Sequence, residues 1–265
     1  MPVSLDHNTH TYTDERGRLY KSVSSLISDY KQPFEPYKIM ANGKPLIENY
    51  VNKNGGTVNS QLGAWDEKRE YACDRGHAFH SLKELAVISS SYYRADDQLL
   101  PVRNIGYIWN IIGEGGFSML PPGVYTEMVL WNYTAKIAGT ADLVILYPDR
   151  TFSIKDYKTN GEFRTESYMN RLMKPPFHNH YDCHMGHYTA QLSFYAWMLM
   201  QYGWKLRDLE LLHYALSPED SGLIMELQVM PPSLQPTSYQ VLFDQGAVEE
   251  VVQDRIDFLS KLKHR

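Results

Sequence analysis

The chain has 265 residues, which is enough to bury a substantial core, and one large domain is expected rather than two. Its hydrophobic fraction of 43% and charged fraction of 22% are those of an ordinary globular protein, which excludes disordered and fibrous classes. The net charge of −5 provides no overall basic field. A nucleic-acid ligand therefore requires a local basic groove, or metal ions that offset an acidic site.

Two cysteines are present, Cys73 and Cys183. Two thiolates cannot supply the four ligands of an ordinary iron–sulfur cluster, and this is no disulfide scaffold. The first ten residues, MPVSLDHNTH, lack a signal-peptide pattern, and the longest apolar run, FYAWMLM, is too short to cross a bilayer. These features predict an intracellular, cytoplasmic protein without a membrane partner.

The first 115 residues predict a hairpin followed by helices. Acidic residues and Gly17 form a turn between two short alternating runs, and Pro33 ends the short helix that follows. A long helical pattern contains Gly76, where we expect a bend because glycine weakens a helix interior. The expected elements are strands at 9–13 and 19–23, a helix within 24–32, a weak helix at 37–52, and helices at 60–89 and 102–113.

The second half of the chain predicts a sheet. Alternating or continuous apolar runs, separated by short polar turns, indicate three antiparallel strands at 124–133, 136–147 and 151–159. Together the two halves predict an α/β (α+β) fold, a mixed sheet flanked by helices. The remaining expected elements are a polar, His-rich connector at 161–187, a helix at 187–202, strands at 209–217 and 223–229, and a terminal helix at 238–263.

A short turn fixes the pairing of the second and third of these strands. If Pro148, Asp149 and Arg150 form the loop, Asp142 lies opposite Asp156 at about 5 Å between Cβ atoms. The same register puts Lys158 on the face of both acids, whereas a one-residue slip would separate the acids. Two adjacent carboxylates share a proton or bind a cation, and oxygen ligands favour Mg²⁺ or Mn²⁺ over zinc. A structural ion pair is the alternative interpretation of Asp156 and Lys158 considered alone.

Five short motifs follow one another along the chain. They are G-x-x-x-H at residues 76–80, a strand acid at Glu127, G-x-x-D at 139–142, D-x-K at 156–158 and Q-x-x-x-Y at 191–195. With these motifs in this order, the sequence resembles the PD-(D/E)XK nuclease superfamily, and within it the RecB-like branch. The residues around the hairpin at the start and around KPPFHNHYDCHMGH look like phage-encoded relatives of the mitochondrial genome maintenance exonuclease.

The resemblance implies a restriction-endonuclease-like core at 116–265, with residues 1–115 forming a substrate-side wall of one nuclease domain. It implies that Asp142 and Asp156 are the principal metal ligands, joined by the backbone carbonyl of Tyr157. His80 is implied as a further ligand, and Glu127 as support for a second ion or its water. Lys158 is implied as the catalytic lysine. A cluster-bearing subtype is not expected, because the paired cysteines of those members are missing.

Substrate contacts are expected on two segments. Gln191 and Tyr195 are four apart on a predicted helix and so share a face, which the resemblance implies lines the site. Arg164, Arg171 and Lys174 lie in the connector, where a flap could contact DNA phosphates and a solvated linker is the alternative. The connector also offers a competing zinc site whose spacing matches no common finger, composed of His178, His180, Cys183, His184 and His187.

The function expected from these residues is an Mg²⁺- or Mn²⁺-dependent deoxyribonuclease with one or two ions. The likeness favours an exonuclease on single-stranded DNA or DNA ends, acting in phage replication, recombination or repair beside other proteins of those processes. Two alternatives stay open, a structure-specific or nicking endonuclease of the same fold and a nucleic-acid-binding module without catalysis. The residues do not decide the polarity of digestion.

Overall fold

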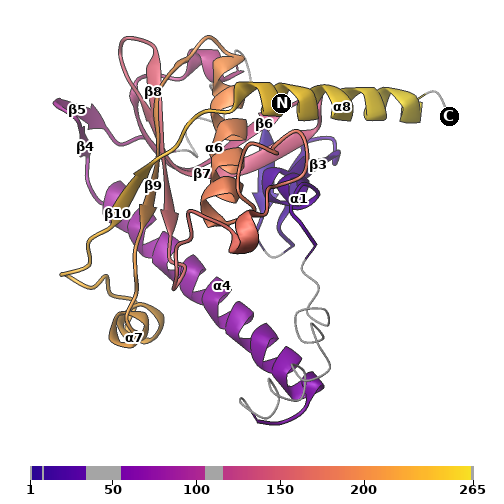
Figure 1. The fold of residues 1–265 in the computed structure, drawn as a ribbon. Coiled ribbons are helices and arrows are strands. Elements are labelled where there is room, and N and C mark those ends of the chain that lie inside the picture. Colours follow the sequence, from indigo (N-terminus) through magenta and orange to yellow (C-terminus); the bar gives the residue numbers. More distant parts are fainter. Residues whose placement is uncertain (1, 8, 34–54, 105–115, 264–265) are drawn as a thin grey trace.

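The computed structural model describes residues 2–7, 9–33, 55–104 and 116–263, and its centre is an eight-stranded mixed sheet with helices on both faces (Figure 1). This confirms the expected α+β class. The helices are α1 (Val23–Ser28), α4 (Val58–Ile88), α6 (His184–Met200), α7 (Pro218–Glu226) and α8 (Gln245–Lys263), with the 3-10 turns η1 (Gly116–Met119) and η2 (Tyr168–Asn170). The strands of the main sheet are β1 (Val3–Asp6), β2 (Thr11–Asp14), β3 (Leu19–Ser22), β6 (Gly123–Asn132), β7 (Ile137–Leu146), β8 (Thr151–Lys158), β9 (Lys205–His213) and β10 (Thr237–Gln240).

Strand β7 is the centre of the sheet, and three strands pair with it. Antiparallel β6 follows it from Ile137 to Leu146 and so occupies one edge for the full length. The other edge is shared, since β3 pairs with residues 137–138 and β8 pairs with residues 143–146. Neither pairing reaches residues 139–142, so β3 and β8 diverge there and leave a fork in the sheet. From β8 the sheet continues through parallel β9 to antiparallel β10.

Each face of the sheet is covered by different helices. Helix α6 packs on one face, with α1 and α8 beside it, and its run LSFYAWML is buried all round. The opposite face is covered by α4 and α7, and there Phe79 lies with Leu143, Ile145 and Tyr157. An apolar helix surrounded in this way is a core helix, which explains why α6 shows little amphipathic pattern.

Helix α4 covers the sheet with its second half only. Thr57 caps its start, because the Thr57 hydroxyl accepts the Ser60 amide and the Ser60 hydroxyl accepts the Thr57 amide. The first half extends beyond the sheet (Figure 1), and its described side chains are exposed or half-buried. The helix continues without interruption through Gly76. Helix α4 is therefore anchored by the packing of its C-terminal half on the sheet, and its N-terminal half projects past the edge of the sheet.

Two predicted elements of the second half are wrong. Residues 223–229 were expected as a strand, but α7 covers Pro218–Glu226. Ser217 and Asp220 form a capping box, and Pro218 at the first helical position starts a helix well. The terminal helix was expected from 238, but Thr237–Gln240 pair with β9 as β10, and the helix begins at Gln245.

The N-terminal hairpin is confirmed, and it belongs to the central sheet. Strand β1, which the sequence did not predict, pairs with β2, and β3 pairs with β7. A second unpredicted hairpin is formed by β4 (Tyr92–Ala95) and β5 (Gln98–Pro101). The helix expected from 102 does not begin there, since Val102 bridges Val124. The rest of that helix and the weak helix at 37–52 lie outside the described residues.

Candidate metal centre and cleft

The turn between β7 and β8 has the predicted geometry. The Tyr147 amide donates to the Thr151 carbonyl at 2.9 Å, and the register runs to Leu143 opposite Lys155. Asp142 and Asp156 are the next residues of the two strands. There the backbone ladder stops, and the Tyr157 amide donates to Asp142 Oδ2 at 2.6 Å. The Asp142 carboxylate thus bridges the fork where a backbone carbonyl would continue a regular ladder.

Asp156 is a buried acid paired with a lysine. Its exposed fraction is 1%, and Lys158 Nζ lies 2.6 Å from its Oδ2. Lys158 is the partner of Oδ2, and Asp156 Oδ1 accepts no hydrogen bond from the described residues. Lys158 Nζ also lies 4.4 Å from the ring centroid of Tyr188 on α6. Buried carboxylate oxygens normally have hydrogen-bond donors or a metal ion, so the free lone pairs of Asp156 fit a bound cation.

His80 reaches the acids from α4, on the other side of the fork. Its Nδ1 lies 3.4 Å from Asp142 Oδ1 and 3.8 Å from Glu127 Oε1, while its Nε2 lies 3.1 Å from the Tyr157 carbonyl oxygen. One ligand atom from each of His80, Glu127 and Asp142 lies within 4.8 Å of the others. These three residues form a group that can hold a metal ion. Asp156 lies outside this group, so its role as a ligand stays a prediction.

Glu127 is directed to the site by an unusual backbone conformation. The pairs Thr126–Leu143 and Met128–Ala141 flank it, so Glu127 stands opposite Asp142 in β6. Its φ is +45°, in the left-handed region that residues other than glycine rarely adopt. Such a conformation costs on the order of 1–3 kcal/mol, and within a strand it is one of the features that cluster at functional sites. Nothing in the sequence of β6 predicts it.

The charged groups of the centre shift one another's pKa. Burial by itself lowers the pKa of His80, but the Asp142 charge and the contacts with Asp142 and Glu127 raise it to about 10. Burial raises the pKa of Asp156 to about 6, because the Lys158 charge offsets the burial only in part and the Asp142 charge adds to it. Lys158 keeps a raised pKa despite its burial, because of Asp156 and Asp142. Asp142 has a lowered pKa, since the His80 and Lys158 charges outweigh its burial.

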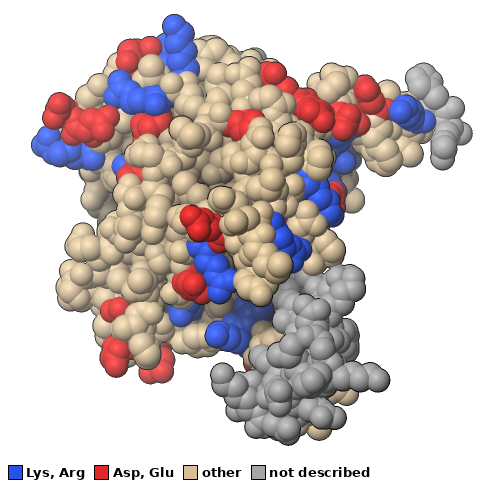
Figure 2. All heavy atoms as spheres, in the orientation of Figure 1, with Lys and Arg blue, Asp and Glu red and all other residues tan. Residues whose placement is uncertain are grey.

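A cleft of about 950 Å³ opens onto Lys158 and His80. One wall is α4, which contributes Lys68 and Arg75, and the other is the loop after β8, which contributes Arg164, Tyr168 and Arg171. In Figure 2, Lys and Arg side chains gather over the middle of the face shown, with acidic side chains among them. A second cavity of about 550 Å³ adjoins His80 along α4 and is also lined by Glu127 and His77. The candidate centre therefore lies between two cavities.

Only some of the residues expected to contact the substrate line the cleft. Arg164 and Arg171 line the cleft, but Lys174 Nζ donates to the Asp29 carbonyl at 3.0 Å, next to α1. Gln191 Nε2 donates to the Tyr195 hydroxyl at 2.9 Å, and neither residue lines the cleft.

Tyr195 lies deep in the core, with an exposed fraction of 3%, against β7 in the fork. A Cβ atom at Gly139 would come 2.5 Å from Cε1 of Tyr195, so this position requires glycine.

The His-rich segment does not gather its ligands. His180 Nε2 lies 2.7 Å from Asp244 Oδ2, and His187 Nε2 lies 2.6 Å from Asp182 Oδ1. His184 Nδ1 accepts the Arg164 amide at 3.2 Å. Among the described residues, the group of three or more candidate ligands is the one at His80, and it includes no member of this segment.

Comparisons with known proteins give little for this chain. No protein-family model and no curated protein matches it. Among solved structures, the crystal structure of SSO0001 matches with a TM-score of 0.24 and 15% identity. The match covers 58% of this chain and 56% of SSO0001. In the described part of the chain, no helix is both long and apolar enough to cross a membrane.

Proposed function

We propose that this protein is a metal-dependent nuclease that hydrolyses phosphodiester bonds in DNA. The observation that carries the proposal is the buried acids at the fork, with Lys158 Nζ 2.6 Å from Asp156 and His80 Nδ1 3.4 Å from Asp142. Lys158 and His80 line a cleft that basic and acidic side chains share, and the two acids lie directly behind them. This arrangement of acids, lysine and histidine supports the resemblance to PD-(D/E)XK nucleases that is based on the motifs. It is the arrangement that cleavage of a phosphate ester requires, with anionic ligands for a cation and a cation for the phosphate.

The donor set suits a hard divalent cation. Asp142, Asp156, Glu127 and the Tyr157 carbonyl would offer oxygen ligands, with His80 as a nitrogen ligand, and this set fits one or two Mg²⁺ or Mn²⁺ ions. A bound ion would supply Lewis-acid polarisation of the phosphate and would lower the pKa of a water molecule. His80 must lose its second proton to act as a ligand, so an ion would replace that proton as the positive charge beside Asp142.

Lys158 contributes charge at the floor of the cleft. Its raised pKa keeps the ammonium group protonated, so it is suited to stabilising negative charge on the phosphate and not to removing a proton from water. Asp156 holds the ammonium group in position, and the Tyr188 ring limits its movement on the other side. Arg171 makes no ion pair within the described part of the chain, which leaves its guanidinium available to a phosphate.

A catalytically silent nucleic-acid-binding module is a second candidate, and one observation favours it. In this structure protonated His80 and Lys158 already offset the charges of Asp142 and Asp156, so only Glu127 would be left for an ion to neutralise. The two candidates differ in what a divalent ion does. A nuclease loses its activity with Asp142→Asn, whereas a binding module binds DNA equally well with and without the ion.

The test compares end-labelled linear DNA with covalently closed circles, each single- and double-stranded, in Mg²⁺, in Mn²⁺ and in EDTA. The proposal expects ion-dependent degradation that Asp142→Asn and Lys158→Met both abolish while the variants remain folded. Intact circles beside degraded linear strands would identify an exonuclease, and cut circles an endonuclease. A wild-type protein that binds DNA but leaves every substrate intact in both ions would refute the proposal and support the binding module.

A further inference from the structure

Tyr168 is the one tyrosine of the cleft with an unoccupied ring. Three tyrosines line the cleft, namely 157, 168 and 188. The first is buried, with an exposed fraction of 6%, and Tyr188 carries the Lys158 ammonium on its ring and donates to Asn160 Oδ1 at 2.9 Å. Tyr168 has an exposed fraction of 79%, and neither its ring nor its hydroxyl has a partner among the described residues.

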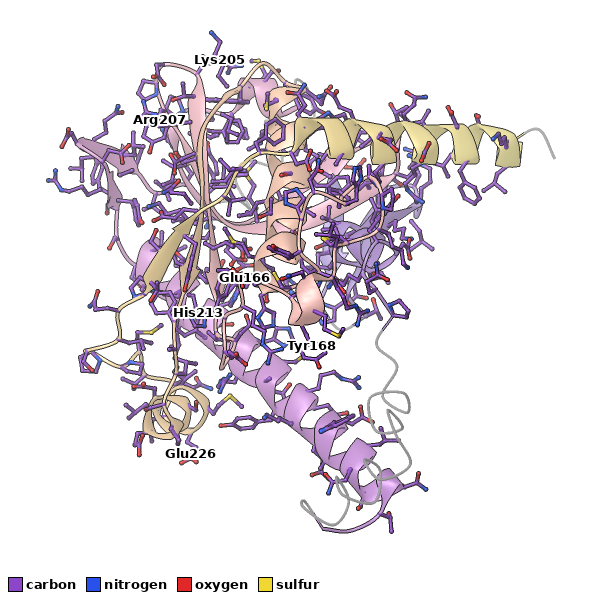
Figure 3. The ribbon with its side chains drawn as sticks, in the orientation of Figure 1. Glu166, Tyr168, Lys205, Arg207, His213 and Glu226 are labelled. Carbon is purple, nitrogen blue, oxygen red and sulfur yellow. The ribbon has the colours of Figure 1, made fainter. Side chains whose placement is uncertain are left out.

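The loop that carries Tyr168 is held closed by its own hydrogen bonds. The Asn170 amide donates to the Ser167 carbonyl at 3.2 Å, and the Ser167 hydroxyl donates to the Arg171 carbonyl at 2.5 Å. The Asp182 amide donates to the same Arg171 carbonyl at 2.8 Å and fastens the turn to the segment before α6. Figure 3 shows Tyr168 on this loop near the start of α6. The backbone under the ring is therefore fixed by the closed turn, so a ligand that binds on the ring has to order only the Tyr168 side chain.

Positive charges stand on both sides of the cleft. Lys68 and Arg75 are seven positions apart on α4 and so share a face of that helix, and Arg171 lines the loop opposite. Arg164 on the same loop is paired with Glu162 at 2.7 Å, and Glu166 and Asp182 also line this wall. Arg75 is partly engaged, since its Nη2 donates to the Thr159 carbonyl at 2.8 Å. Lys68 and Arg171 make no ion pair with described residues. The cleft thus offers cations on two walls and an exposed aromatic ring between them. A ligand complementary to it has several anionic groups, which pair with the cations, and a flat apolar face, which stacks on the ring.

We propose that Tyr168 is a base-stacking residue, and that the cleft binds an unpaired stretch of nucleic acid with a base on the Tyr168 ring and its phosphates on Lys68 and Arg171. This rests on the proposed function, because it places the substrate in the cleft above Lys158. Inside a duplex both faces of a base are covered by its neighbours, so a stacking ring selects a single strand or an unpaired end. The assignment of Tyr168 comes from the exposure of its ring in the cleft, since the residue belongs to none of the five motifs.

The experiment measures binding in EDTA, where no hydrolysis occurs, by the anisotropy of dye-labelled 12-nucleotide single strands. One strand carries ordinary bases, and its match carries abasic sites with the same phosphates. Stacking is worth about 1–3 kcal/mol per base, so Tyr168→Ala should weaken binding of the ordinary strand about 5- to 150-fold and of the abasic strand less than about twofold. Tyr168→Phe keeps the ring and should bind like the wild type.

Met169→Ala is the matched control. Met169 is the next residue of the same turn, has the same exposed fraction of 79%, and does not line the cleft. Its replacement should change neither affinity. Equal weakening of both strands by Tyr168→Ala, no effect on either, or a wild type that binds neither strand would overturn the assignment.

Binding and hydrolysis separate the two proposals. If the base-dependent loss appears and no substrate is cleaved in Mg²⁺ or Mn²⁺, Tyr168 is a stacking residue of a binding module and the nuclease proposal fails alone. If DNA is cleaved and Tyr168→Ala has no base-dependent effect, the stacking assignment fails alone.

Discussion

Two regions of this molecule are rich in potential metal ligands, and they arrange them in opposite ways. Four histidines and Cys183 lie within residues 178–187, yet the described hydrogen bonds of the histidine rings there go to three different partners, Asp244, Asp182 and Arg164. At the fork, His80, Glu127 and Asp142 come from α4, β6 and β7, far apart in the sequence, and place their ligand atoms within 4.8 Å. Closeness along the chain therefore does not make a metal site. The convergence of elements does.

The reason is geometric. Neighbouring side chains on a loop or helix point in different directions, and residues 178–187 include the bend into α6. At the fork, the pairing of β6, β7 and β8 sets the positions of the acidic side chains, and α4 places His80 next to them, with its Nε2 3.1 Å from the Tyr157 carbonyl oxygen. Substitutions in one of the two regions, with matched substitutions in the other as controls, test whether only the fork binds a metal ion.

The largest effect is expected for Asp142→Asn. The substitution keeps the size of the side chain and an oxygen for the Tyr157 amide but removes the charge that a divalent ion requires. We expect Mn²⁺ binding, measured by calorimetry, to be lost and phosphodiester hydrolysis to fall by at least about a hundredfold. The double variant His180→Ala/His187→Ala is the reference and should retain Mn²⁺ binding. The same loss in both variants would show that the His-rich segment contributes to the centre.

Lys158→Ala should destabilise the protein most strongly in the absence of metal. It leaves the buried Asp156 carboxylate without its ion-pair partner, which costs about 3–5 kcal/mol of unfolding free energy in buried pairs. Added Mg²⁺ should restore a larger part of the Tm than it adds to the wild type, since an ion can replace the lost charge. Lys155→Ala, which breaks a more exposed pair with Glu210, is the control and should cost about 1 kcal/mol or less. A Tm equally unaffected by Mg²⁺ in Lys158→Ala and wild type would argue against a cation at Asp156.

His80→Ala should weaken Mn²⁺ binding about 10- to 100-fold without abolishing it, since the carboxylates remain. Calorimetric titration measures the change. His184→Ala, on the segment near the cleft, is the comparison and should leave the affinity within about twofold. An unchanged affinity in His80→Ala would remove His80 from the set of ligands.

The smallest effect is expected for the change in Tm that the His-rich segment causes when the pH is lowered. Burial, the main cause, lowers the pKa of His184 and of His187 below the ordinary 6.5. The unfolded chain therefore takes up protons at a pH where the folded segment stays neutral, so stability falls as the pH drops below about 6.5. The Tm of wild type should fall more between pH 7.5 and pH 5.5 than that of His184→Asn/His187→Asn. Identical falls would mean that these histidines titrate normally in the folded protein.

The sheet could be predicted from the sequence to the level of single residue pairs. The apolar runs of β6, β7 and β8 are bounded by short polar turns, and the three residues after Tyr147 leave one register that puts both acids on one face. The errors fall where local patterns are short or ambiguous. Residues 223–229 contain apolar residues suited to either a strand or a helix, and the capping box at Ser217 decided for a helix. The four-residue strands β1, β4 and β5 gave no pattern long enough to detect.

The candidate site was predictable as a set of residues, but its geometry was not. The motifs indicated His80, Glu127, Asp142, Asp156 and Lys158, and the structure brings these together around the fork. The left-handed backbone at Glu127, the Asp142 bond to the Tyr157 amide and the exposed ring of Tyr168 had no sequence signal. Lys174 was expected at the substrate, but its ammonium group donates to the Asp29 carbonyl at the end of α1.

By itself the sequence determined the class of fold, the strands that carry the acids and the register between them. Periodicity and turn length act between residues only a few positions apart, and such interactions can be read from the order of the residues. The tertiary structure alone decided that the fork opens at Asp142, that His80 of α4 reaches Asp142 there, and that His180, His184 and His187 bond to different partners. Those outcomes depend on how distant elements pack, and the direction of a side chain across such a contact is set by packing that no local pattern encodes.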